Sequence, residues 1–99
     1  MIKKIVIACM AVASMAALAD ESIDKGKQRA AVCASCHGAV GISNGPVWPN
    51  LAGQKAGYLM KQLKDFRSGT RKDPMMSAMA APLTDEDIKN LAAYYSSLK

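Results

Sequence analysis

The sequence predicts a small all-α domain whose three main helices are separated by unusually long loops. Three segments carry apolar residues at the three- and four-residue spacing of an amphipathic helix, and no segment longer than a few residues alternates as a half-buried strand does. Residues 38–53 and 70–83 hold most of the glycines and prolines, so we expect loops there. Loops of this length in a compact domain are commonly functional or disordered, and we expect these two to wrap around a bound group.

Residues 1–19 have the layout of a secretory signal peptide. Two lysines precede an apolar run over residues 5–18, which ends in the small-x-small pattern Ala17-Leu18-Ala19. The run is too short to span a bilayer comfortably. We therefore expect cleavage after residue 19, export to the periplasm, and a mature domain of residues 20–99 that has no stable membrane insertion.

The first helix is expected from about Ser22 to Val32. Ser22 is a possible N-cap, and Ile23, Gly26 and Ala30 lie on one face. Glycine inside a helix costs about 1 kcal/mol relative to alanine. Gly26 therefore indicates a place where a second helix crosses closely.

The second helix is expected over Lys55–Arg67. Leu59, Leu63 and Phe66 are spaced four and three residues apart, so they form one apolar stripe. The dipeptide Ser68-Gly69 predicts where this helix ends.

The third helix has the clearest boundary signals. Thr84 and Asp87 have the spacing of a capping box, and the acidic triplet 85–87 complements the positive end of the helix dipole. One apolar face follows, made of Ile88, Leu91, Ala92, Tyr95 and Leu98.

The predicted mature domain carries 11 basic and eight acidic side chains, a formal net charge of +3. This balance is too mild to indicate nucleic-acid binding, and export would remove the chain from that partner. Six basic residues and one acidic residue lie between residues 55 and 72. They are interpreted either as solvated helix faces that complement helix dipoles or as a docking surface for an acidic partner.

The motif Cys33-Ala34-Ser35-Cys36-His37 carries the most chemical information. A structural zinc site needs four ligands, whereas the predicted mature chain offers two cysteines and one histidine. A thioredoxin-like dithiol lies in a βαβ setting, whereas here a helical segment precedes the motif and no strand does. Both interpretations are therefore disfavoured.

Covalent haem attachment accounts for every feature of this motif. Two thiols separated by two residues can reach two vinyl groups on one edge of a porphyrin, and the next residue places an imidazole beneath the ring. Cys-x-x-Cys-His is the recognised attachment signature, and an exported protein meets the oxidising conditions suited to it. A domain this small needs stabilisation beyond its core. One haem c, bound through Cys33 and Cys36 with His37 as an axial iron ligand, would supply it.

Five segments together cover nearly the whole predicted mature chain: GKQRAAVCASCHG, PNLAGQ, YLMKQLKDFRSGTR, DPMMSAMAAPLTDEDI and LAAYY. On these segments the chain resembles a class I c-type cytochrome of the small bacterial mono-haem type, and also one half of the periplasmic dihaem cytochromes. The resemblance implies the cytochrome c fold, with the first and last helices crossing near Gly26 and Tyr94 or Tyr95. It also implies that the carbonyl of Pro49 accepts a hydrogen bond from Nδ1 of His37, which would fix the imidazole ring.

A low-spin electron carrier needs a sixth iron ligand, and methionine sulfur is the candidate in a chain with one histidine. Met75, Met76 and Met79 lie in the loop before the third helix, and spacing alone does not choose among them or exclude a packing role for all three. The resemblance implies Met76. With both axial positions filled, the iron would cycle between Fe(II) and Fe(III) during brief encounters with redox partner proteins. This function is that of an electron carrier and not of an enzyme.

Three alternatives remain. A haem sensor or peroxidase-like protein would have an open sixth position, although gas-binding four-helix c-type cytochromes carry the motif near the C-terminus. A copper module would use the methionine cluster, since thioethers favour Cu(I), but it would leave the cysteine motif unexplained. A subunit docked permanently in a larger complex would transfer electrons without shuttling.

Overall fold

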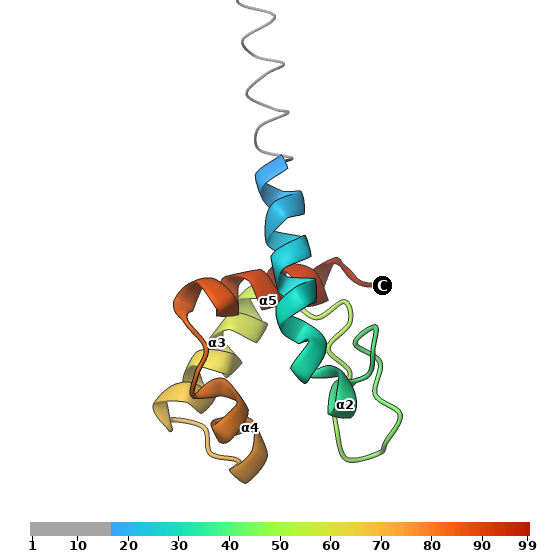
Figure 1. The fold of residues 1–99 in the computed structure, drawn as a ribbon. Helices are drawn as coiled ribbons and strands as arrows, with labels where there is room; N and C mark the ends of the chain where they lie inside the picture. Colours follow the sequence, from blue (N-terminus) through green and yellow to red (C-terminus); the bar gives the residue numbers. More distant parts are fainter. Residues whose placement is uncertain (1–16) are drawn as a thin grey trace, which may run out of the picture.

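The structure is a computed structural model that describes residues 17–99 (Figure 1). A helix over residues 17–29 opens the described part, and the 3-10 helix η1 (Ala30–Val32) and the short α2 (Ala34–His37) follow it. A long loop then leads to the remaining helices, which are α3 (Ala56–Ser68), α4 (Pro74–Ala80) and α5 (Asp85–Ser97). Residues 17–99 contain no strand, so the predicted all-α class is confirmed.

Helix 17–29 and α5 cross at Gly26, as predicted. A Cβ atom on Gly26 would overlap the Asn90 carbonyl oxygen and would lie 2.8 Å from Cβ of Tyr94. Figure 1 shows helix 17–29 passing across α5 at this point. Only a residue without a side chain allows the two backbones to approach this closely.

The core lies between α5 and α3. Ile88 and Leu91 of α5 are fully buried side chains, and Leu59 and Phe66 of α3 are buried against the same cluster. The predicted capping box at the start of α5 is present, because Thr84 and Asp87 exchange side-chain to backbone hydrogen bonds of 3.0 Å. The apolar stripes of both predicted helices therefore face the core.

Two predictions about helices are wrong. Helix 17–29 already includes Ser22, because the preceding residues, mostly alanine, leucine and glutamate, are good helix formers. The predicted loop 70–83 contains α4, a helix that Asp73 caps by accepting hydrogen bonds from the backbone of Met75 and Met76. Pro74 occupies its first position, where the missing N–H costs nothing.

The predicted loop over residues 38–53 is confirmed, and backbone hydrogen bonds close it. The carbonyl of Gly41 accepts from the backbone N–H groups of Leu51 (2.8 Å) and Ala52 (3.0 Å). The N–H of Gly53 donates to the carbonyl of Tyr95 at 2.9 Å. These hydrogen bonds therefore join the two ends of the loop to each other and attach the loop to α5.

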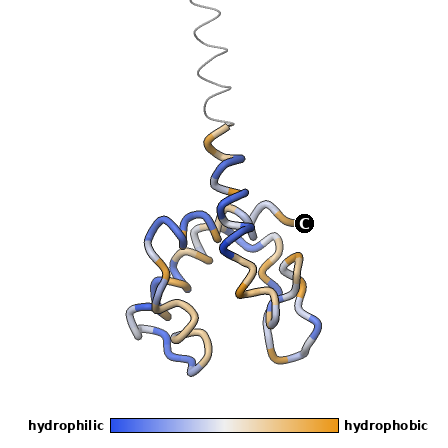
Figure 2. The backbone as a smooth tube through the Cα atoms, viewed as in Figure 1, coloured by the Kyte–Doolittle hydropathy of each residue, from blue (hydrophilic) through white to orange (hydrophobic). Residues whose placement is uncertain are grey.

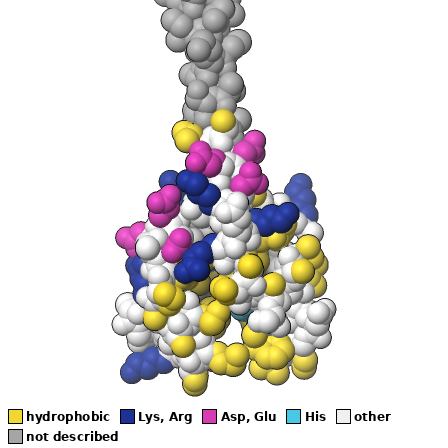
Figure 3. All heavy atoms as spheres, in the orientation of Figure 1, with side chains coloured by type: hydrophobic (Ala, Val, Ile, Leu, Met, Phe, Trp, Pro, Cys, Tyr) yellow, Lys and Arg dark blue, Asp and Glu magenta, His cyan; other side chains and the backbone are white. Residues whose placement is uncertain are grey.

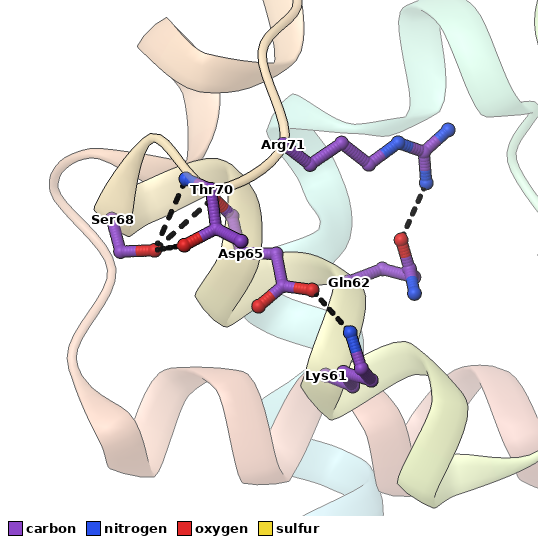
Figure 4. Close-up of polar contacts among 6 residues, drawn as sticks. All are labelled: Lys61, Gln62, Asp65, Ser68, Thr70 and Arg71. Carbon is purple, nitrogen blue, oxygen red and sulfur yellow. Dashed lines mark hydrogen bonds and ion pairs between the residues drawn. The ribbon is translucent and has the colours of Figure 1, made fainter.

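Several basic side chains of residues 55–72 form ion pairs or hydrogen bonds with other side chains of the protein (Figure 4). Lys61 pairs with Asp65 at 2.6 Å, and Arg71 donates to the Gln62 side chain at 2.7 Å. Arg67 pairs with Asp85 at 2.6 Å. These contacts favour the interpretation of solvated helix faces for these three side chains.

Residues 1–16 of the predicted signal peptide lie outside the described residues, and residues 17–19 belong to the first described helix. Across the described part of the chain, no helix is both long and apolar enough to cross a membrane.

Candidate functional site

The cysteine motif forms a single helical turn. Cys33 is the N-cap of α2, and its carbonyl accepts hydrogen bonds from the backbone N–H groups of Cys36 (3.3 Å) and His37 (2.9 Å). Residues at i, i+3 and i+4 of a helix lie on the same face. The two thiols and the imidazole therefore leave the backbone from one face of α2.

The imidazole of His37 is held in one orientation. The side chain is buried, with 6% of its surface exposed, and Nδ1 lies 2.8 Å from the Pro49 carbonyl oxygen. A carbonyl only accepts hydrogen bonds, so Nδ1 carries the proton and Nε2 has the free lone pair. No hydrogen bond to Nε2 is found within residues 17–99, which leaves this nitrogen available as a metal ligand.

The turn after His37 requires glycine. Gly38 has a φ of +88°, a conformation that other residues rarely adopt. A Cβ atom there would also overlap the carbonyl oxygen of Ile42. This reversal directs the chain from α2 into the loop that supplies the Pro49 carbonyl.

The two thiols are free and partly buried. Cys33 packs against the core, and its sulfur lies beside the hydroxyl of Tyr95. Burial is the main cause that raises the pKa of the Cys33 thiol, and burial followed by the neighbouring thiol raises the pKa of Tyr95. The helical period predicted Tyr95 as a core residue, and the family resemblance implied that Tyr94 or Tyr95 lies near the helix crossing. Neither indicates that the Tyr95 hydroxyl meets the Cys33 thiol.

The three candidate methionines occupy different environments on α4. Met76 is partly buried and packs against the core, whereas Met75 and Met79 are 55% and 40% exposed. In Figure 1, α4 and α2 lie on the same side of the crossing between helix 17–29 and α5. Figure 3 shows hydrophobic side chains gathered on this side around a hollow.

This arrangement fits a covalently attached haem. The residues supply two thiols at the attachment spacing, an imidazole with an available Nε2, and exposed apolar side chains that suit a flat apolar ring. Within residues 17–99, no three histidine, cysteine, aspartate or glutamate side chains are close enough to hold a metal ion. A porphyrin needs no such cluster, because its own nitrogens provide four of the iron ligands.

Comparison with known proteins likewise indicates a haem protein of the cytochrome c family. The family model of cytochrome c matches residues 23–99. Cytochrome c4 of Thiocapsa roseopersicina is 50% identical over 66 residues, which cover 67% of this chain and 34% of that protein. Cytochrome c-554(548) of Halomonas halodenitrificans is 45% identical over 75 residues, which cover 73% of this chain and 90% of that protein.

The fold agrees with these matches. The crystal structure of reduced recombinant cytochrome c4 from Pseudomonas stutzeri superposes with a TM-score of 0.73 and 33% identity, covering 81% of this chain and 50% of that one. This chain thus spans about a third to a half of the cytochrome c4 chains it matches, and most of cytochrome c-554(548). The chain belongs to the cytochrome c family.

Proposed function

We propose that this protein carries single electrons between redox partner proteins in the periplasm, using one haem c attached to Cys33 and Cys36. The observation that carries the proposal is the hydrogen bond between Nδ1 of His37 and the Pro49 carbonyl. It leaves Nε2 as the ligating atom, on the same helical turn as the two thiols. Family membership supports covalent haem and haem-based electron transfer.

Each of these residues has a separate task. Cys33 and Cys36 would hold the porphyrin through thioether bonds, and Nε2 of His37 would ligate the iron. The Pro49 carbonyl keeps the ring in one orientation. When bound, haem supplies an iron that cycles between Fe(II) and Fe(III).

The sixth ligand in this proposal is Met76. Its side chain is the least exposed of the three in α4, and its own backbone N–H is fixed by a 2.8 Å hydrogen bond to Asp73. The cap fixes the backbone at Met76, and the packing of its side chain against the core limits where the thioether can lie. His/Met ligation also raises the reduction potential.

A carrier of this kind needs no substrate pocket. With His37 and Met76 as its protein ligands, the haem iron would have no position for a small molecule, and the haem would supply one-electron redox chemistry. A haem protein with an open sixth position would instead bind carbon monoxide rapidly when reduced.

Export also belongs to the proposal. The signal-peptide pattern over residues 1–19 supports it, and the functional domain would then be residues 20–99. The intact mass of protein recovered from a periplasmic fraction tests both points, because it should equal that of residues 20–99 plus one haem.

The central experiment uses full-length protein matured in bacteria that possess haem-attachment machinery. We expect visible spectra of a low-spin haem in both oxidation states, and haem that stays with the protein during acid–acetone extraction. The matched control is the double variant Cys33→Ser/Cys36→Ser, from which any bound haem should be extractable. Extractable haem in the wild type, or none, would overturn covalent attachment. Rapid binding of carbon monoxide by the reduced protein would overturn His/Met ligation.

A further inference from the structure

The two neighbouring tyrosines of α5, Tyr94 and Tyr95, meet different parts of the molecule. Tyr94 lies at the helix crossing, since a Cβ atom on Gly26 would stand 2.8 Å from its Cβ. Tyr95 lies against the cysteine motif instead, with its hydroxyl beside the Cys33 sulfur. Both side chains are buried, at 6% and 4% exposed, and their ring centres are 5.1 Å apart. Two adjacent side chains of the same chemistry therefore have different neighbours.

Cys33 lies where the chain enters the apolar interior. The chain changes from mainly hydrophilic in helix 17–29 to hydrophobic over residues 30–33 (Figure 2). Cys33 then packs against the buried cluster to which Tyr95 belongs. A buried tyrosine hydroxyl usually has a hydrogen-bond partner, and the Cys33 sulfur is in position to be that partner.

The Tyr95 ring is held against the long loop after α2. A Cβ atom on Gly41 would lie 3.1 Å from Cδ1 of this ring, so the loop backbone packs directly on it. The Tyr95 carbonyl accepts a hydrogen bond of 2.9 Å from the N–H of Gly53, at the other end of the loop. With backbone and ring both held, the hydroxyl has little freedom to turn away from Cys33.

Haem attachment would fix the direction of the contact between the hydroxyl and the sulfur. A thiol and a phenol can each donate to the other, but a thioether sulfur carries no hydrogen and can only accept. Tyrosine has an ordinary pKa of about 10, and burial raises the pKa of Tyr95 further. The hydroxyl is therefore protonated at neutral pH and is a donor to the attached sulfur.

We propose that Tyr95 is a positioning residue of the haem site, whose hydroxyl donates a hydrogen bond to the thioether sulfur of Cys33. This inference rests on the proposed attachment of haem at that cysteine. The donor would hold the sulfur in one orientation and draw electron density from the edge of the ring bonded to it. Lower electron density at the ring favours Fe(II) over Fe(III), and hydrogen bonding around a haem is one means by which a protein sets its reduction potential. The hydroxyl should therefore raise the reduction potential.

The test removes one hydroxyl at a time from the haem-loaded protein. Tyr95→Phe keeps the ring that packs on Gly41 and removes only the oxygen beside Cys33. The matched control is Tyr94→Phe, which removes a hydroxyl from the adjacent buried ring. Spectroelectrochemical titration measures the midpoint potential of each protein. At the potential where half of the wild type is reduced, we expect clearly less than half of Tyr95→Phe, and half of Tyr94→Phe, to be reduced.

Two spectra show whether the change in potential comes from the contact with the sulfur. The pyridine haemochrome spectrum of each variant should remain that of a haem with two thioether bonds. The far-red band of the oxidised protein should persist, because neither substitution removes a proposed axial ligand. Loss of either feature in Tyr95→Phe would place the effect at the attachment or at the iron ligands, and would overturn the inference.

Two results of the titration would also overturn it. An unchanged or higher midpoint potential in Tyr95→Phe would show that the hydroxyl serves packing or stability alone. An equal change in Tyr94→Phe would show that the loss of any buried hydroxyl in this helix has the same effect. Extractable haem in the wild type would instead refute the proposed function itself, so the two failures are distinguishable.

Discussion

Gly26 of helix 17–29 lies directly against the backbone of Asn90 in α5. A Cβ atom on Gly26 would stand 2.6 Å from the Asn90 carbonyl carbon and 2.8 Å from Cβ of Tyr94. Neither atom can move aside unless α5 itself moves. The absence of a side chain at position 26 therefore sets how closely the two helices cross.

The substitution Gly26→Ala should destabilise the protein. Forcing a methyl group into a closely packed contact typically costs about 1–3 kcal/mol, and here the obstacle is backbone. This loss should outweigh the gain of about 1 kcal/mol in helix propensity. Chemical denaturation of the haem-loaded variant measures the difference.

The control for this substitution is Gly57→Ala in α3. A Cβ atom on Gly57 would meet nothing within 4 Å, so the variant should gain about 0.5–1 kcal/mol in free energy of unfolding. Equal effects of the two substitutions would contradict the close crossing at Gly26.

The substitution Thr84→Ala should cost about 1 kcal/mol in free energy of unfolding. The Thr84 hydroxyl oxygen accepts from the backbone N–H of Asp87 at 3.0 Å, and alanine would leave that group without this partner. Thermal unfolding compares it with Thr84→Ser, which keeps a hydroxyl and should stay close to the wild type. If both variants behave alike, the hydroxyl does not contribute to the start of α5.

Acid should weaken the fold through Asp87. The hydrogen bond from the backbone of Thr84 is the main cause that lowers the pKa of Asp87, and the nearby Arg29 contributes in the same direction. A carboxyl whose pKa is lower when folded stabilises the fold above its unfolded pKa, about 3.9. That contribution is lost as the pH falls through the folded pKa.

The pH dependence can be measured as the free energy of unfolding between about pH 7 and pH 2.5. The wild type should lose more stability over the acid part of this range than Asp87→Asn, which has no carboxyl to protonate. Parallel curves for the two proteins would show that Asp87 does not have a lowered pKa in the fold.

Replacing Met76 with alanine should remove the far-red sulfur-to-iron band of the oxidised protein, because this thioether is the proposed sixth ligand. Met75→Ala and Met79→Ala are the matched controls on the same short helix and should keep the band. A band that survives in Met76→Ala, or disappears in a control, would assign the ligand differently.

Features decided by neighbouring residues were predictable from the sequence. The apolar stripes of α3 and α5 follow the helical period, and the capping box of Thr84 and Asp87 needs only residues three apart. The haem interpretation likewise rests on a five-residue motif, Cys33–His37. In each case the relevant groups are close in the chain, so their spacing is enough to predict the contact.

Features decided by contacts between distant residues needed the tertiary structure. Helix α4 is too short to show a clear period and depends on the Asp73 cap and on packing beside α3. The Pro49 carbonyl meets His37, which lies twelve positions earlier in the chain, a contact that the family resemblance implied but no local pattern predicts. The hydrogen bonds that join the two ends of this loop at Gly41 likewise link residues ten and eleven positions apart. The sequence alone thus determined the chemistry of the motif and the main helices, while only the assembled fold decided which distant groups meet, because loop closure and burial depend on the whole chain.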